Sequence, residues 1–121
     1  MRSETITWEG GEHEFALSVP LLVALEEKSR DKSIGAILQR LELSYLQNSH
    51  FYTISDIKDT VSLALEGGGK EKQEAYNLVL GIISERGLYC LLPTAYGILG
   101  NALMGWPDDE GKPTAEAERN S

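Results

Sequence analysis

Three glycines and a lysine precede a helix-like run in the middle of the chain, and these residue types can bind phosphate. Gly67, Gly68, Gly69 and Lys70 could offer backbone N–H groups and a positive charge to an anion. A Walker-type loop also requires a preceding buried strand and a Ser or Thr after the lysine. Glu71 occupies that position, and the preceding residues have a helical period. We therefore predict that the three glycines form a structural turn with a left-handed helix cap.

A histidine between two glutamates is the second candidate for chemistry. Glu12, His13 and Glu14 could offer ligands to a divalent metal ion. Adjacent side chains of a strand face opposite sides, however, so a water-exposed hairpin is favoured over a metal site. Cys90 lies among leucines and a tyrosine, which predicts a buried and unreactive thiol. The nucleophile motif GxSxG is absent. We expect no enzyme, no cofactor and no metal.

Composition and net charge limit the classes of protein to which this chain can belong. The chain has 121 residues, enough for one domain with its own core. Its net charge of −8 would repel the phosphates of a nucleic acid, so nucleic-acid binding is not expected. The sequence contains no apolar run long enough to cross a membrane and no apolar N-terminal stretch typical of a signal peptide. We expect a cytoplasmic protein that does not bind membranes.

Hydrophobic periodicity predicts a mainly α (α+β) fold. Ile6 and Trp8 before a Gly-Gly pair, with Phe15 and Leu17 after it, predict a short N-terminal β-hairpin. Five stretches with helical spacing follow, and their predicted starts are near Pro20, Ser33, Thr53, Lys70 and Pro93. The hairpin and about five helices are expected to form one compact domain over residues 1–107.

Two further features concern the last helix and the C-terminus. Gly97 and Gly100 lower helix propensity, which predicts the close approach of another helix on that face. Residues 108–121 contain five acidic residues and almost no apolar side chain. This composition predicts a disordered acidic tail.

A partner-binding surface is predicted from the largest apolar side chains outside the helical stripes. These side chains are Trp8, Tyr45, Phe51, Tyr52 and Trp106. Large aromatics often anchor protein interfaces, although a place in the core is the alternative for each of them.

The order of several segments resembles a small gene transfer agent and phage tail protein family encoded beside the tail tube genes. LLVALEE, SIGAILQRL, DIKDTVSLALEGGG, AYNLV and AYGILGNALMG carry the resemblance, which covers roughly residues 5–107. The run from Ala64 to Gly69 is similar to the family's AL.GGG signature. Ala95, Ile98, Leu99 and the residues after them are similar to its closing helix. Members are described as tail assembly chaperones, and some names call the family a tail tube protein.

The resemblance implies a role in building a phage-like tail. As a non-catalytic chaperone, the protein would hold the tape-measure protein soluble in the host cytoplasm during particle assembly. The alternative is a structural tube or ring component that stays in the particle. The implied partners are the tape-measure protein or other tail proteins, and a homo-oligomer is possible. A small ligand-binding domain that uses residues 67–70 is a more distant alternative.

Overall fold

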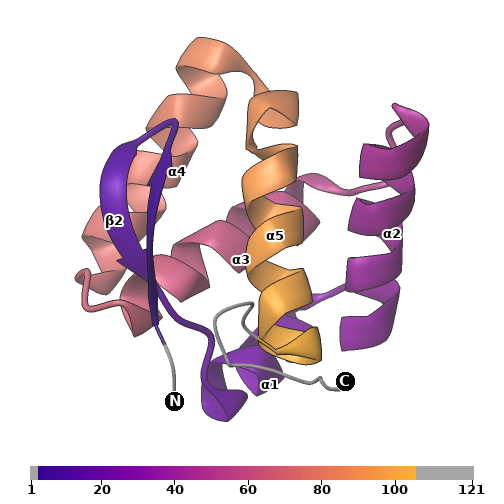
Figure 1. Ribbon diagram of the computed structural model, residues 1–121, viewed down its shortest axis with the longest axis horizontal. Coiled ribbons are helices and arrows are strands. Elements are labelled where there is room, and N and C mark those ends of the chain that lie inside the picture. The colour runs from indigo at the N-terminus through magenta and orange to yellow at the C-terminus, as the bar shows by residue number, and fades with distance from the viewer. Residues whose placement is uncertain (1–2, 106–121) are drawn as a thin grey trace, which may run out of the picture.

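The computed structural model describes residues 3–105. A two-stranded hairpin is followed by five α-helices (Figure 1), which confirms the predicted mainly α fold with an N-terminal hairpin. The elements are β1 (Glu4–Trp8), β2 (Gly11–Phe15), α1 (Val19–Lys28), α2 (Ile34–Gln47), α3 (Ile54–Gly67), α4 (Lys72–Arg86), the 3-10 turn η1 (Leu88–Leu91) and α5 (Leu92–Met104). Trp106 and the predicted tail at 108–121 lie outside the described residues, so the boundary at 107 stays a prediction.

The hairpin pairs two five-residue strands in antiparallel register. Trp8 lies opposite Gly11, so the turn residues are Glu9 and Gly10, one position earlier than the Gly-Gly pair suggests. Gly11 begins β2 with a φ of +104°, a backbone conformation that glycine adopts without steric cost. At the other end of β2, Phe15 is fully buried and fastens the hairpin to the core.

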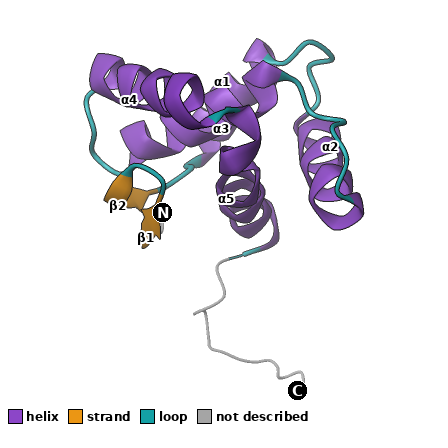
Figure 2. Cartoon of the chain, turned by 90° about the horizontal axis from the view of Figure 1, so that it is seen from above, coloured by secondary structure: helices purple, strands orange, loops and turns teal. Residues whose placement is uncertain are grey.

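Helix α3 is the centre of the domain. It contacts all four other α-helices, η1 and strand β2, and lies among the other helices in Figure 2. Ile57, Val61 and Leu65 on this helix are fully buried. The predicted cap at its start is confirmed: the Thr53 hydroxyl accepts from the Asp56 N–H at 3.0 Å, and the Asp56 carboxylate accepts from the Thr53 N–H at 2.9 Å. This largely buried helix therefore begins with a reciprocal side-chain cap.

Side-chain caps also set the starts of two neighbouring helices. The Ser33 hydroxyl accepts from the Ala36 N–H at 3.1 Å and caps α2, as predicted. Helix α4 begins two residues after its predicted start at Lys70, because the Glu71 carboxylate accepts from the Glu74 N–H at 3.0 Å. The residue that replaces a Walker hydroxyl is therefore a helix cap.

Candidate protein-binding surface

The glycine turn after α3 does not present its amides to a ligand. The Lys70 N–H donates to the Leu65 carbonyl and the Gly69 N–H donates to the Glu66 carbonyl, each at 3.0 Å. Together with a φ of +113° at Gly69, these bonds form a Schellman cap, the left-handed helix end that the sequence predicts. A phosphate site needs such N–H groups free to point at the anion. Here they satisfy the last carbonyls of α3.

The first two glycines of the turn lie against the end of β2. A Cβ atom on Gly67 would lie 1.9 Å from the Ala16 carbonyl oxygen, and one on Gly68 would lie 2.0 Å from the Glu14 carbonyl oxygen. The Ala16 N–H also donates to the Ala64 carbonyl of α3 at 3.0 Å. Any side chain at either glycine would push the strand away, so the role of these positions lies in packing.

Trp8 lies beside the turn of the hairpin, half-buried against the core. Its ring meets that of Phe15 edge to face, with centroids 5.3 Å apart. Its Nε1–H donates to His13 Nδ1 at 2.9 Å, so the neutral imidazole is the acceptor. Burial, with a smaller contribution from Lys70, lowers the pKa of His13. The ring contacts of Trp8 are with His13 and Phe15 of the same hairpin, so this side chain has a packing role.

Tyr45 and Tyr52 each lie beside a tyrosine from the last third of the chain, and Phe51 precedes Tyr52 in the sequence. The Tyr45 and Tyr96 rings are 5.2 Å apart, and the Tyr52 and Tyr89 rings are 6.4 Å apart. We call these five residues the aromatic face. Tyr89 and Tyr96 were missed in the sequence analysis, because a single aromatic in a helical run gives no sign of which distant segment lies beside it.

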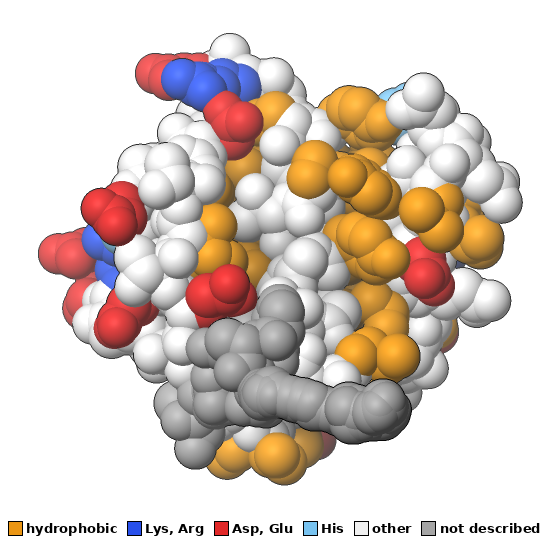
Figure 3. Space-filling view, viewed as in Figure 1, with side chains coloured by type: hydrophobic (Ala, Val, Ile, Leu, Met, Phe, Trp, Pro, Cys, Tyr) orange, Lys and Arg blue, Asp and Glu red, His pale blue; other side chains and the backbone are white. Residues whose placement is uncertain are grey.

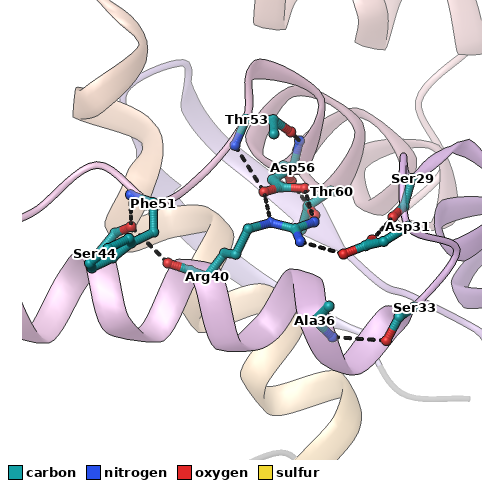
Figure 4. Close-up of polar contacts among 10 residues, drawn as sticks. All are labelled: Ser29, Asp31, Ser33, Ala36, Arg40, Ser44, Phe51, Thr53, Asp56 and Thr60. Atoms are coloured by element: carbon teal, nitrogen blue, oxygen red, sulfur yellow. Dashed lines mark hydrogen bonds and ion pairs between the residues drawn. The ribbon is translucent and has the colours of Figure 1, made fainter.

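The connection between α2 and α3 is held in place by hydrogen bonds. The Ser44 hydroxyl accepts from the Phe51 N–H at 2.8 Å (Figure 4), and the Tyr89 hydroxyl donates to the Asn48 side-chain oxygen at 3.0 Å. The His50 ring is 5.1 Å from the Tyr89 ring and its Nδ1 lies 2.8 Å from the Tyr52 hydroxyl. Phe51 and Tyr52 are thereby held on a fixed loop, which lowers the entropy cost of binding a partner.

Arg40 fixes the other side of the same connection (Figure 4). Its guanidinium donates two hydrogen bonds to Asp56, at 2.7 and 2.9 Å, and a third to Asp31 at 2.6 Å. The bond from Arg40, together with one from the Ser29 hydroxyl, lowers the pKa of Asp31 from 3.8 to about 2. Both carboxylates in turn raise the pKa of Arg40. The pair formed with Asp56 joins α2 to the start of α3.

A groove of about 420 Å³ runs between α2 and α5, beside the aromatic face. Its lining residues are Leu38, Glu42, Tyr96, Gly97, Gly100, Asn101 and Met104. The predicted close approach of a helix to Gly97 and Gly100 is wrong within the described residues, because a Cβ atom at either position would meet no atom within 4 Å. Helix α5 packs instead through Ala95, Ile98 and Leu99, which are fully buried. Its glycines face the groove.

A second cleft, of about 510 Å³, lies between α1, α3 and α4. Lys28, Lys58 and Lys72 line it together with Asp59 and Glu66. The Lys58 ammonium lies 3.6 Å from a carboxylate oxygen of Asp59. Because positive and negative side chains both line this cleft, its charge favours neither anionic nor cationic ligands. It is therefore a weaker candidate site.

The remaining candidates for chemistry are the Cys90 thiol and clusters of metal-ligating side chains. The Cys90 thiol is partly buried and donates to the Gly87 carbonyl at 3.1 Å, and burial raises its pKa. A raised pKa keeps the sulfur in its less nucleophilic thiol form. Over residues 3–105, no three metal-ligating side chains cluster closely enough to hold an ion. No helix in that range has the length and apolar character needed to span a bilayer.

The fold and this surface define a small, mainly helical domain with an exposed aromatic face and an adjoining groove. Residues 3–105 match the family described as phage tail tube protein, GTA-gp10. The match spans the entire described part of the chain, and the protein belongs to this family. Searches of curated proteins and of solved structures gave no significant match. The resemblance to a phage tail and gene transfer agent family is therefore confirmed, and interaction with other tail proteins follows from it.

Proposed function

We propose that this protein is a non-catalytic component of a phage-like tail that contacts other tail proteins through the aromatic face. The observation that carries the proposal is the exposure of that face on an ordered scaffold. The side chains of Phe51, Tyr45 and Tyr89 are 50%, 47% and 42% exposed. The Phe51 N–H is nevertheless bonded to the Ser44 hydroxyl, and the Tyr89 hydroxyl is bonded to the Asn48 side chain. Rigid, exposed aromatic side chains are typical anchors of protein interfaces.

The family description favours a structural role in the finished tail. Under this reading the protein is a tube or ring subunit, and copies of it remain in the particle. Its binding surface would then be buried against the next tail protein or the next copy. A permanent interface of this kind buries large apolar side chains at its centre.

A second candidate function is that of an assembly chaperone for the tape-measure protein, and the small hairpin favours it. Each strand has five residues, and β1 and β2 are the only strands within residues 3–105. A tube wall made of continuous β-structure would call for longer strands in a larger sheet. A net charge of −8 also suits a protein that keeps a partner soluble.

Two measurements test these proposals. Phe51→Ala with Tyr89→Ala should weaken capture of co-expressed tail proteins, whereas the control Tyr76→Ala removes an exposed tyrosine on α4 and should not. Equal binding by all variants would overturn the aromatic face as the contact surface. Immunoblotting of purified particles then separates the roles: a stoichiometric band supports the tube or ring subunit. Absence from particles, with a soluble tape-measure complex in the cell, supports the chaperone.

A further inference from the structure

The groove between α2 and α5 is open, apolar and continuous with the aromatic face. Figure 3 shows apolar side chains gathered over the boundary between these two helices. Gly97 and Gly100 leave space along α5, while Leu38 and Tyr96 form apolar walls. Met104 at the end of α5 is 81% exposed. An exposed apolar surface rimmed by polar groups is a feature of interaction sites.

We propose that this groove binds an amphipathic α-helix of a partner protein, with a Lys or Arg of that helix against Glu42. The inference rests on the proposed function and specifies the partner segment. A groove between two helices can hold a third helix, which lies in it by its apolar face. Gly97 and Gly100 are three residues apart on one face of α5, so a helix backbone can approach closely there.

The charge of the groove selects a basic helix. Glu42 is the only charged side chain among its lining residues. The Tyr96 hydroxyl donates to Glu42 Oε2 at 3.3 Å, which holds the carboxylate at the edge of the groove. Together with a net charge of −8, this arrangement favours a cationic segment and disfavours an acidic one.

The dimensions set the length of the partner segment. Helix α5 has 13 residues, which corresponds to about 20 Å at the usual helical rise. The 5.2 Å contact between the Tyr45 and Tyr96 rings joins the groove to the aromatic face. A partner helix of about four turns would therefore span the groove and reach Tyr45. Its apolar residues would recur at spacings of three and four.

The groove can be blocked without disturbing the core. Gly97→Leu would fill it, and the matched control Gly81→Leu places the same side chain on the exposed surface of α4, where a Cβ atom also meets nothing within 4 Å. Both variants replace a helical glycine by a better helix former and should fold. Labelled 25-residue peptides that tile the co-encoded tape-measure and tube proteins provide the probe, and fluorescence anisotropy with the full chain measures their binding. We expect at least about ten-fold weaker binding for Gly97→Leu and no change for Gly81→Leu.

A second pair of variants tests the charge. Glu42→Arg and Glu85→Arg change the net charge equally, but Glu85 is exposed on α4, away from the groove. We expect only Glu42→Arg to weaken binding strongly, and the peptides that bind should carry Lys or Arg beside an apolar stripe. Equal losses in both variants, or binding by acidic peptides, would overturn the assignment of a basic helix.

Photo-cross-linking from Tyr96→p-benzoylphenylalanine identifies what lies in the groove. Cross-links to a bound peptide support the proposal, whereas cross-links to a second copy or to residues 106–121 overturn it. Different results would overturn the helix-binding groove and the proposed function. If Gly97→Leu binds intact tail proteins normally while Phe51→Ala with Tyr89→Ala does not, the groove inference fails and the proposed function stands. If the wild-type chain binds no tail protein, the proposed function fails.

Discussion

Arg40 is the residue that joins the most segments around the α2–α3 connection. It reaches from α2 to the cap of α3 through Asp56 and to the α1–α2 connection through Asp31. Asp56 is only 2% exposed, and its carboxylate accepts hydrogen bonds from this partner and from the Thr53 amide. The two-bond geometry between guanidinium and carboxylate is the strong form of such a pair. Phe51 and Tyr52 of the aromatic face belong to this connection, so Arg40 helps to hold them in position.

Removing Arg40 should therefore destabilise the fold. We expect Arg40→Ala to lower the free energy of unfolding by about 3 kcal/mol, because a buried carboxylate loses its countercharge. Urea denaturation measures the loss. The control Arg30→Ala removes an exposed arginine and should stay within about 0.5 kcal/mol of the wild type. Equal stability of the two variants would contradict the bridging role of Arg40.

Asp31 gives the protein a specific response to acid. Its pKa is about 2 in the folded chain against 3.8 in the reference state, so the folded protein binds this proton less readily. The ionised Asp31 carboxylate therefore stabilises the fold at pH values above 3.8, and this stabilisation is lost as the pH falls to about 2. The stability difference between wild type and Asp31→Asn should shrink across that interval. Denaturation curves at a series of pH values, repeated at high salt, would show it; a constant difference would refute it.

At the scale of elements, the contact between β2 and α3 decides whether the hairpin docks. The strand end lies so close to the helix end that Gly67 and Gly68 have no room for a Cβ atom. The Glu9 carboxylate pairs with Arg86 at the far end of the hairpin and ties it to α4 as well. The hairpin therefore depends on the helices for its position, as a two-stranded ribbon alone is only marginally stable.

A single methyl group at this contact should have a large effect. We expect Gly67→Ala to cost at least about 3 kcal/mol, because its Cβ would overlap a backbone carbonyl that cannot move alone. Gly81→Ala, in open space on α4, should instead stabilise the protein by about 0.5–1 kcal/mol. Thermal unfolding of both variants measures the contrast. A tolerated Gly67→Ala would mean that the strand end is not held against α3.

Substitution of Trp8 tests whether this side chain stabilises the fold or binds a partner. Trp8→Ala should lower the free energy of unfolding by about 2 kcal/mol, since it removes a half-buried ring in contact with Phe15 and the bond to His13. Phe51→Ala, at a side chain 50% exposed, should change it by less than about 0.5 kcal/mol. Chemical denaturation compares the two. Unchanged stability of Trp8→Ala, together with weaker partner binding, would place Trp8 in the partner surface as the sequence suggests.

At the scale of the whole molecule, the net charge of −8 is the dominant long-range property. It should speed the encounter with a basic partner segment and slow the encounter with an acidic one. We expect association with a basic tail segment to slow as salt rises from about 0.05 to 0.5 M, because the screening length shortens over that range. Stopped-flow or surface-based kinetics would measure the effect in the association rate. A rate independent of salt would show that apolar contacts alone govern binding.

The sequence by itself determined the elements and several of their ends. The alternation from Ile6 to Leu17 predicts the hairpin, because strands alternate their side chains between two faces. Thr53 with Asp56, and Ser33, predict helix starts through local side-chain bonds, and the glycines after α3 predict its left-handed cap. These features depend on residues that are close in the sequence, so short stretches of sequence are enough to predict them.

Only the tertiary structure decided which distant residues form the site. Tyr45 meets Tyr96 because α2 and α5 pack beside each other, and Tyr52 likewise lies beside the distant Tyr89; no local period encodes these long-range contacts. For the same reason the sequence misplaced Gly97: the lack of a side chain permits close packing but does not require it, and here the space remains open. Local bonding fixed the elements, whereas the burial of their apolar faces against one another fixed the surface on which function depends.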